Sequence, residues 1–235
     1  MCQVRAIRST VSGRHDDSGL AFASAYPATY CALLSKPAEN RRFPLQSYAL
    51  MENALKRLNG LPNDAAEAEL LACCGASRWA REMAARRPFN DFTHLFAAAD
   101  EIWRGLGRED WLEAFSHHPQ IGEKRTEKQM EAGAGQPLSS RWSAEEQSGT
   151  QDKSAEIMAR LTEGNRAYQQ RFGYIFIVCA TGKTAREMLA ILERRLQNDA
   201  SAELNVAAEE QRLITHLRLQ KLLEIGVPEK RADAS

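Results

Sequence analysis

WLEAFSHHPQIGE, residues 111–123, predicts a helix that carries a histidine to its end on the core side. At 3.6 residues per turn, Trp111, Phe115 and His118 follow the spacing i, i+4, i+7 and share one helix face. Pro119 disfavours helical geometry for the residue before it, so the helix is expected to end at His118. A neutral imidazole exchanges protons near pH 7, which suits acid–base chemistry. A histidine that is simply packed at a helix end is the alternative interpretation.

The composition of the 235-residue chain indicates a soluble, mostly helical protein. Its 31 basic and 31 acidic residues cancel, so no global field favours nucleic acid or an anionic membrane. Five cysteines without a CxxC pair argue against a disulfide framework or zinc knuckle and indicate a reducing compartment. No run approaches about 18 uninterrupted apolar residues, and β-branched runs are scarce. We therefore expect an all-α fold and no membrane span.

The helical patterns predict one compact domain of about eight helices. This domain is expected to span residues 46–228, between a disordered or weakly ordered, flexible extension at 1–45 and a short tail at 229–235. One helix is expected to stop near Gly75. Capping signals precede several of the others: Asn63-Asp64, Ser77, Asn90-Asp91 and Thr184-x-x-Glu187.

Residues 122–142 are polar and rich in glycine, which predicts a mobile loop beside the histidine. The pattern Ser143-x-x-Glu146 that follows is a capping box, in which both side chains satisfy free N–H groups at a helix start. Helical spacing also places Glu146 on the face of Ile157 and Leu161, which would turn its carboxylate inward. The two roles are compatible.

A β-like apolar run, residues 174–180, precedes Thr181-Gly-Lys-Thr184. A phosphate-binding loop would need a glycine where this chain has Ile177, so that interpretation is rejected. Cys179 lies inside the apolar run, where a cysteine is usually inert packing rather than a nucleophile.

Arg218 stands in an apolar arc of the last long helix, with Ile214 four residues before it and Leu222 four residues after it. A buried arginine is costly unless it meets an anion. The sequence leaves two candidates for this anion: a structural carboxylate such as Glu146, or a bound ligand.

Several short motifs occur in a fixed order: Arg-Pro-Phe (87–89), His-Pro-x-Ile-Gly (118–122), Ser-x-x-Glu-Gln-Ser-Gly (143–149), Asn-x-x-Tyr-x-x-Arg-Phe-Gly (165–173), Phe-Ile-Val-Cys-Ala (176–180), Arg-Leu-x-Asn (195–198) and Leu-Arg-Leu (217–219). This order and spacing resemble the 2-oxo-4-hydroxy-4-carboxy-5-ureidoimidazoline (OHCU) decarboxylases of urate breakdown. The likeness extends over residues 57–225. The 1–45 extension has no counterpart in it, and the 122–142 loop is longer than is usual in the family.

The resemblance implies an all-helical, usually dimeric enzyme that needs no metal or organic cofactor. His118 matches the catalytic proton donor, and Glu146 matches an essential carboxylate. Substrate contacts are implied for the following residues, the run from 176 to 180 acting through its backbone: Pro119, Ser143, Gln147, Phe176, Ile177, Val178, Cys179, Ala180 and Arg218.

The implied reaction is the loss of CO2 from OHCU to give (S)-allantoin, with no nucleic-acid or membrane partner. The C-terminal Asp233-Ala-Ser235 is not a peroxisomal Ser-Lys-Leu signal, which favours the cytoplasm. A helical interaction module without chemistry is one alternative. A metal-dependent hydrolase using His94, His117 and His118 is another, although the sequence has no H-x-x-x-H or H-E-x-x-H spacing.

Overall fold

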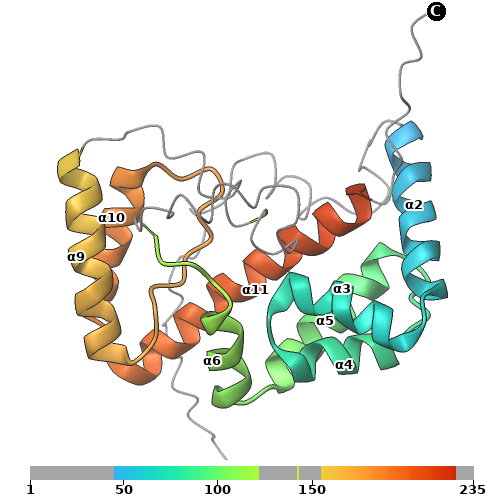
Figure 1. Ribbon diagram of the computed structural model, residues 1–235, viewed down its shortest axis with the longest axis horizontal. Helices are drawn as coiled ribbons and strands as arrows, with labels where there is room; N and C mark the ends of the chain where they lie inside the picture. Colours follow the sequence, from blue (N-terminus) through green and yellow to red (C-terminus); the bar gives the residue numbers. More distant parts are fainter. Residues whose placement is uncertain (1–44, 122–141, 143–154, 226–235) are drawn as a thin grey trace, which may run out of the picture. The chain divides into compact units, whose positions relative to one another are not determined.

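The computed structural model describes residues 45–121, 142 and 155–225. The chain divides into two units, Met1–Arg41 and Arg42–Ser235, and all described residues belong to the second. They form eight helices and no strand, which confirms the predicted all-α class (Figure 1). Residues 1–44 of the predicted extension, 122–141 of the predicted loop and the tail at 229–235 lie outside the described residues.

Five helices precede position 121 and three follow position 154. The first group is α2 (Leu45–Gly60), α3 (Asn63–Cys74), α4 (Ser77–Ala85), α5 (Phe92–Gly105) and α6 (Arg108–Ser116). The second group is α9 (Ala155–Phe172), α10 (Ala185–Arg195) and α11 (Ala200–Ile225). α3 packs on α4, α4 on α5 and α6, and α9 on α10, while α11 contacts α2, α3, α5 and α6 (Figure 1). The long helix α11 is therefore the element shared by most of the domain.

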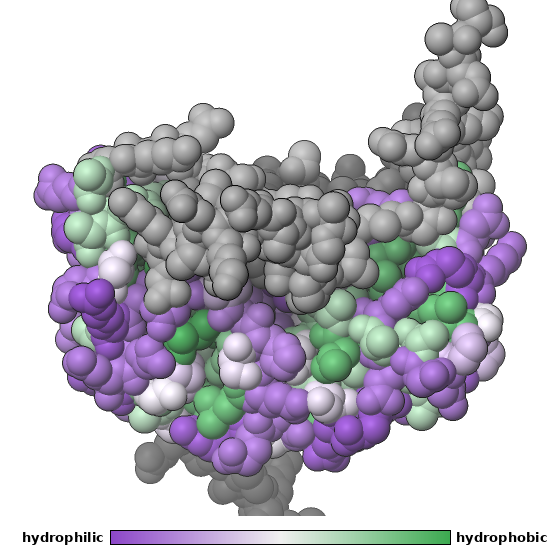
Figure 2. Space-filling model, in the orientation of Figure 1, coloured by the Kyte–Doolittle hydropathy of each residue, from purple (hydrophilic) through white to green (hydrophobic). Residues whose placement is uncertain are grey.

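The buried side chains of these helices form one hydrophobic core, in which Trp79, Phe115 and Tyr168 are fully buried. On the face drawn in Figure 2, hydrophobic side chains form separate patches among hydrophilic ones. Among the described residues, Leu50 is the one large hydrophobic side chain that is well exposed. No helix in this part of the chain combines the length and hydropathy that a membrane crossing requires.

Three of the predicted helix boundaries are confirmed in detail. Asp91 caps α5 by accepting a hydrogen bond from the backbone N–H of His94, and Thr184 with Glu187 forms the predicted capping box of α10. Gly75 ends α3 in the left-handed conformation, with φ of 87°. Each of these boundaries is set by a residue and a partner within about four positions of it, so the sequence alone can predict them.

Two of the predicted caps are wrong. The cap of α3 is Pro62, without a side-chain hydrogen bond, and Asn63 and Asp64 lie inside the helix. The cap of α4 is Ala76, and Ser77 is its first helical residue. In α4 the N–H of Ser77 donates to a carboxylate from another helix, so an acceptor distant in sequence serves one of the free N–H groups at this helix start.

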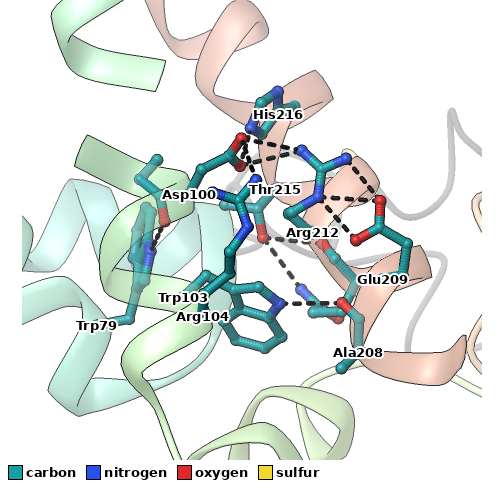
Figure 3. A network of polar contacts seen from close by, with 11 residues as sticks. Trp79, Asp100, Trp103, Arg104, Ala208, Glu209, Arg212, Thr215 and His216 are labelled. Atoms are coloured by element: carbon teal, nitrogen blue, oxygen red, sulfur yellow. Dashed lines mark hydrogen bonds and ion pairs between the residues drawn. The ribbon is translucent and has the colours of Figure 1, made fainter. Parts of the chain in front are cut away.

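A polar network fastens α5 to α11 (Figure 3). The Asp100 carboxylate accepts from Nη1 of Arg212 at 3.0 Å and lies 2.7 Å from Nε2 of His216. Nearby, Nε1 of Trp103 donates to the carbonyl oxygen of Ala208 at 3.0 Å. These contacts fix the position of α11 relative to α5 at several points along both helices.

A second network, fully buried, joins α9, α10 and α11. Nε of Arg195 donates to Oε1 of Glu203 at 2.7 Å, and the Tyr168 hydroxyl donates to the same oxygen. Nη1 of Arg195 donates to the carbonyl oxygen of Ile177 at 2.8 Å. The segment 174–180, predicted to be β-like, contains no strand, and this arginine holds it against the helices.

Candidate active site

His118 follows α6 directly, in a turn rather than in the helix. The last helical residue is Ser116, and His117 is the C-cap, so the predicted end at His118 is two residues too late. The N–H of His118 donates to the carbonyl oxygen of Phe115 at 3.2 Å, three residues back. The last turn is thus tightened before Pro119, which cannot continue the helix. Pro119 itself is exposed.

The start of this turn is fixed by α3 and α4. A Cβ atom at Gly75 would lie 2.9 Å from Cβ of His117, so only glycine allows the two backbones to approach this closely. Glu113 of α6 accepts hydrogen bonds from the backbone N–H and the hydroxyl of Ser77, at 3.1 and 2.6 Å. Glu113 therefore ties α6 to the N-terminus of α4.

The end of the turn is fixed by α9. Nδ2 of Asn165 donates to the carbonyl oxygen of Ile121 at 2.9 Å, and the Ile121 side chain is buried. Nε2 of Gln120 donates to Oε1 of Gln169 at 2.8 Å. With both sides anchored, the backbone of His118 is held between the first and second groups of helices.

The His118 ring is largely shielded from water and lies in an electropositive environment. Its Nε2 atom is buried and has no hydrogen-bond partner within the described residues. Burial and the positive charge of Arg218 lower the pKa of His118 to about 3, against an opposing effect of the Gln211 side chain. At neutral pH these surroundings favour the neutral imidazole.

Arg218 is 1% exposed, which confirms the inward orientation that its sequence context predicts. Its charge also acts on the buried thiols of Cys73 and Cys74 at the end of α3. Burial raises the pKa of Cys74 to about 12, so this thiol stays protonated. His118 and Arg218 are distant in the chain, yet they come together where α3, α6 and α11 meet.

The predicted substrate-facing run, Phe176–Ala180, is buried along its whole length. The backbone N–H of Cys179 donates to Oε2 of Glu210 at 2.7 Å, and Nζ of Lys183 donates to the Cys179 carbonyl oxygen at 2.6 Å. In this structure the Cys179 amide therefore already has an acceptor, which is a carboxylate of α11. Ser143, Glu146 and Gln147 lie outside the described residues.

Three polar residues that shape this region had no role in the sequence-based prediction: Arg195, which was noted only as part of a motif, Glu210 and Gln211. Arg195 and Gln211 are buried at 3% and 0% exposure. A signal for Gln211 was present, because it precedes Arg218 by seven residues and so shares its helix face.

The three histidines considered for a metal site do not converge in the described residues. His94 accepts a hydrogen bond from the N–H of Asn90 at 3.2 Å and packs edge-on against Phe89. Among the residues with described positions, no three His, Cys, Asp or Glu side chains are grouped closely enough to hold a metal ion.

A family model described as OHCU decarboxylase matches residues 59–220, which include His118 and Arg218. The chain belongs to the OHCU decarboxylase family. The match confirms the family resemblance drawn from the ordered motifs, and the matched range includes most of the described helices.

Similar proteins from other organisms agree with this family membership. The OHCU decarboxylase of Haloferax volcanii is 30% identical over 169 residues, which are 72% of this chain and 95% of that protein. The uric acid degradation bifunctional protein TTL of Arabidopsis thaliana is 37% identical over 156 residues. These are 66% of this chain but 47% of that protein, so the chain spans about half the length of the plant relative.

A solved structure has the same fold. It is a crystal structure of an OHCU decarboxylase in the presence of (S)-allantoin, with 37% sequence identity and a TM-score of 0.53. The match covers 67% of this chain and 98% of that chain.

Proposed function

We propose that this protein decarboxylates OHCU to (S)-allantoin in the degradation of uric acid. The observation that carries the proposal is the position of His118 beside the buried charge of Arg218, inside the region that the family model matches. A buried cation next to a neutral imidazole suits a small anion that must lose a carboxylate and gain a proton. The relative crystallised in the presence of (S)-allantoin supports the same product.

In the proposed mechanism, Arg218 orients the anionic substrate. When the C–C bond to the carboxylate breaks, its electron pair passes into the ring system and CO2 leaves. The resulting carbanion or enolate-like species is protonated at carbon by His118, and because His118 stands on one side only, a single enantiomer results. An anion beside Arg218 offsets the charge that lowers the pKa of His118, so substrate binding would favour the imidazolium that donates this proton.

Further parts of the proposal come from the family resemblance. Glu146 helps to hold the protonation state of His118, while Pro119, Ser143, Gln147 and the 176–180 backbone contact the substrate. We also propose that the protein acts as a cytoplasmic homodimer without a metal or organic cofactor. Light scattering of the purified chain tests the dimer, and activity that survives prolonged EDTA treatment would dismiss a metal-dependent hydrolase.

The deciding experiment generates fresh OHCU enzymatically and follows allantoin by circular dichroism with and without the protein. Accumulation of the (S)-enantiomer is the expected result. A helical interaction module without chemistry would leave the spontaneous, racemic product unchanged. It would also show no thermal shift with allantoin, whereas the decarboxylase is expected to gain stability from its product.

Replacing His118 by Asn is expected to lower the turnover rate by about 10²–10⁴, because the variant has no group that can deliver the proton. His117→Asn is the matched control, since His117 is exposed on the same turn and keeps its Cβ contact with Gly75 in either form. Initial rates of (S)-allantoin formation measure both. Near-normal turnover of His118→Asn would rule out the assignment.

A further inference from the structure

Four buried polar atoms have no hydrogen-bond partner within the described residues: Nε2 of His118, Oε1 of Gln211, Oδ1 of Asn165 and the hydroxyl of Tyr174. Leaving such a group unsatisfied inside a protein is destabilising. The first two atoms, near the candidate active site, are chemically complementary, because a ring nitrogen can carry a hydrogen and an amide oxygen can only accept one.

The orientation of the Gln211 amide is fixed by its other contacts. Its Nε2 atom donates to the carbonyl oxygen of Cys74 at 3.1 Å and to the hydroxyl of Thr215 at 3.3 Å. The Thr215 hydroxyl donates in turn to the backbone carbonyl oxygen of Gln211, at 3.0 Å. Because the Cys74 carbonyl can only accept, the amide nitrogen must face it, and Oε1 remains as the free acceptor.

Gln211 also lies close to the His118 ring. Among the effects on the pKa of His118, a hydrogen-bonding effect of Gln211 is the one that favours the protonated ring, against burial and the charges of Arg218 and His117. The Cys74 thiol on the neighbouring α3 is neutral because burial raises its pKa to about 12. Gln211 is therefore a neutral acceptor beside His118, whereas the charges of Arg218 and His117 oppose a positive charge on its ring.

We propose that Gln211 is a positioning residue for His118, whose Nε2–H donates to the Gln211 Oε1 through one enclosed water. This contact selects the Nε2–H tautomer and leaves Nδ1 as the nitrogen that exchanges a proton with the substrate. The inference rests on the proposed function for its catalytic meaning, but the tautomer itself is a property of the free protein.

Nitrogen-15 NMR of the full-length chain tests the tautomer without any activity. The His118 signals are assigned by their loss in His118→Asn. In the wild type we expect the neutral Nε2–H form at pH 7, and in Gln211→Met, which keeps the size but lacks the acceptor, a mixture of both tautomers. An unchanged tautomer in Gln211→Met would overturn the proposal, as would a wild-type His118 in the Nδ1–H form.

Gln211→Glu is the second variant, and it keeps an acceptor while adding a negative charge. It should retain the Nε2–H tautomer and raise the pH at which His118 titrates, so the pH profile of kcat/KM should move upward. A profile that stays in place would contradict the contact. Thr215→Val is the control, because it removes one anchor of the amide nitrogen and leaves Oε1 untouched.

Catalytic rates separate this inference from the function on which it rests. Gln211→Met should lower kcat about 10-fold or more with little change in KM, since the acid is misoriented while substrate binding is kept. If the wild type makes no (S)-allantoin but its tautomer still depends on Gln211, the decarboxylase function fails and the contact stands. A kcat of Gln211→Met equal to that of the wild type would refute the positioning role.

Discussion

At the turn before His118, one backbone conformation controls how closely α3 approaches α6. Gly75 has a φ of 87° and faces the Cβ atom of His117. The sequence predicted that a helix stops near this glycine, which is a local property. The same glycine also makes room for the turn at His117 and His118, 42 residues later in the chain. This depends on tertiary contact, and no local pattern carries that information.

Gly75→Ala is expected to destabilise the protein by about 1–2 kcal/mol from the left-handed conformation alone, with an added cost from the contact with His117. It should also lower decarboxylase activity, because the turn that holds His118 must shift. Urea denaturation and initial rates measure the two effects. Gly60→Ala is the control, since a Cβ there meets nothing within 4 Å, and it should be neutral or slightly stabilising.

At the scale of elements, α6 and α4 are joined by a cap that crosses between helices. Ser77 was predicted to cap its own helix, as serine commonly does, but here it is the Glu113 carboxylate that accepts from its N–H and hydroxyl. The helix start was predicted correctly, but the group that accepts the Ser77 N–H is Glu113 and not a side chain nearby in sequence. The reason is that an acceptor 36 residues away in the chain serves as well as a neighbouring one once the helices pack.

Glu113→Gln should cost about 1 kcal/mol of stability, because the charged acceptor at the N-terminus of α4 is lost. In a double-mutant cycle with Ser77→Ala, the two changes should be strongly non-additive. Thermal or urea denaturation measures the free energy of unfolding of the wild type, of each single variant and of the double variant. Glu109→Ala, on the exposed face of the same helix, is the control. Additive effects of Glu113→Gln and Ser77→Ala would contradict the cross-helix cap.

At the scale of the whole molecule, two polar networks tie the last three helices to one another and to α5. Arg195 and Glu203 form an ion pair at 2.6 Å with side chains that are 4% and 0% exposed. Arg195 stands in a motif of the family resemblance, which gave it no role. The pairing of Arg195 with Glu203 depends on tertiary contact between the end of α10 and the start of α11.

Arg195→Met should destabilise the domain by about 3–5 kcal/mol, because it leaves the Glu203 carboxylate buried without its cation. Arg160→Ala is the matched control. Its partner Glu193 is equally close, but both side chains are about half exposed, so the loss should stay below about 1 kcal/mol. Equal effects of the two variants in urea denaturation would contradict the structural role of the buried pair.

The network around Asp100 predicts how stability depends on pH. Burial alone would raise the pKa of this carboxyl, but hydrogen bonds and charges from His216 and Arg212 outweigh it and lower the pKa from 3.8 to about 2. A carboxyl with a lowered pKa in the folded state contributes stability above its unfolded pKa and loses it as the pH falls through the folded one. The contribution should therefore be constant above about pH 4 and disappear towards about pH 2.

Asp100→Asn should accordingly be less stable than the wild type by about 2 kcal/mol at pH 6, and the gap should close with acidification. Urea unfolding at a series of pH values measures it. Glu101→Gln is the control, because Glu101 pairs with Arg86 on the surface with 70% of its side chain exposed. A gap of constant size from pH 6 to pH 2 would contradict the assignment.

By itself, the sequence determined the all-α class, the boundaries set by Asp91, Thr184 and Gly75, the inward face of Arg218 and the family. Each of these follows from periodicity, from a cap within a few residues, or from an ordered set of motifs. Only the tertiary structure decided that His118 lies beside Arg218 in surroundings that favour the neutral imidazole, that Glu113 caps another helix, and that the buried amide oxygen of Gln211 is left without a partner among the described residues. These depend on burial and on charges brought together from distant helices, and neither is a property of a chain segment read alone.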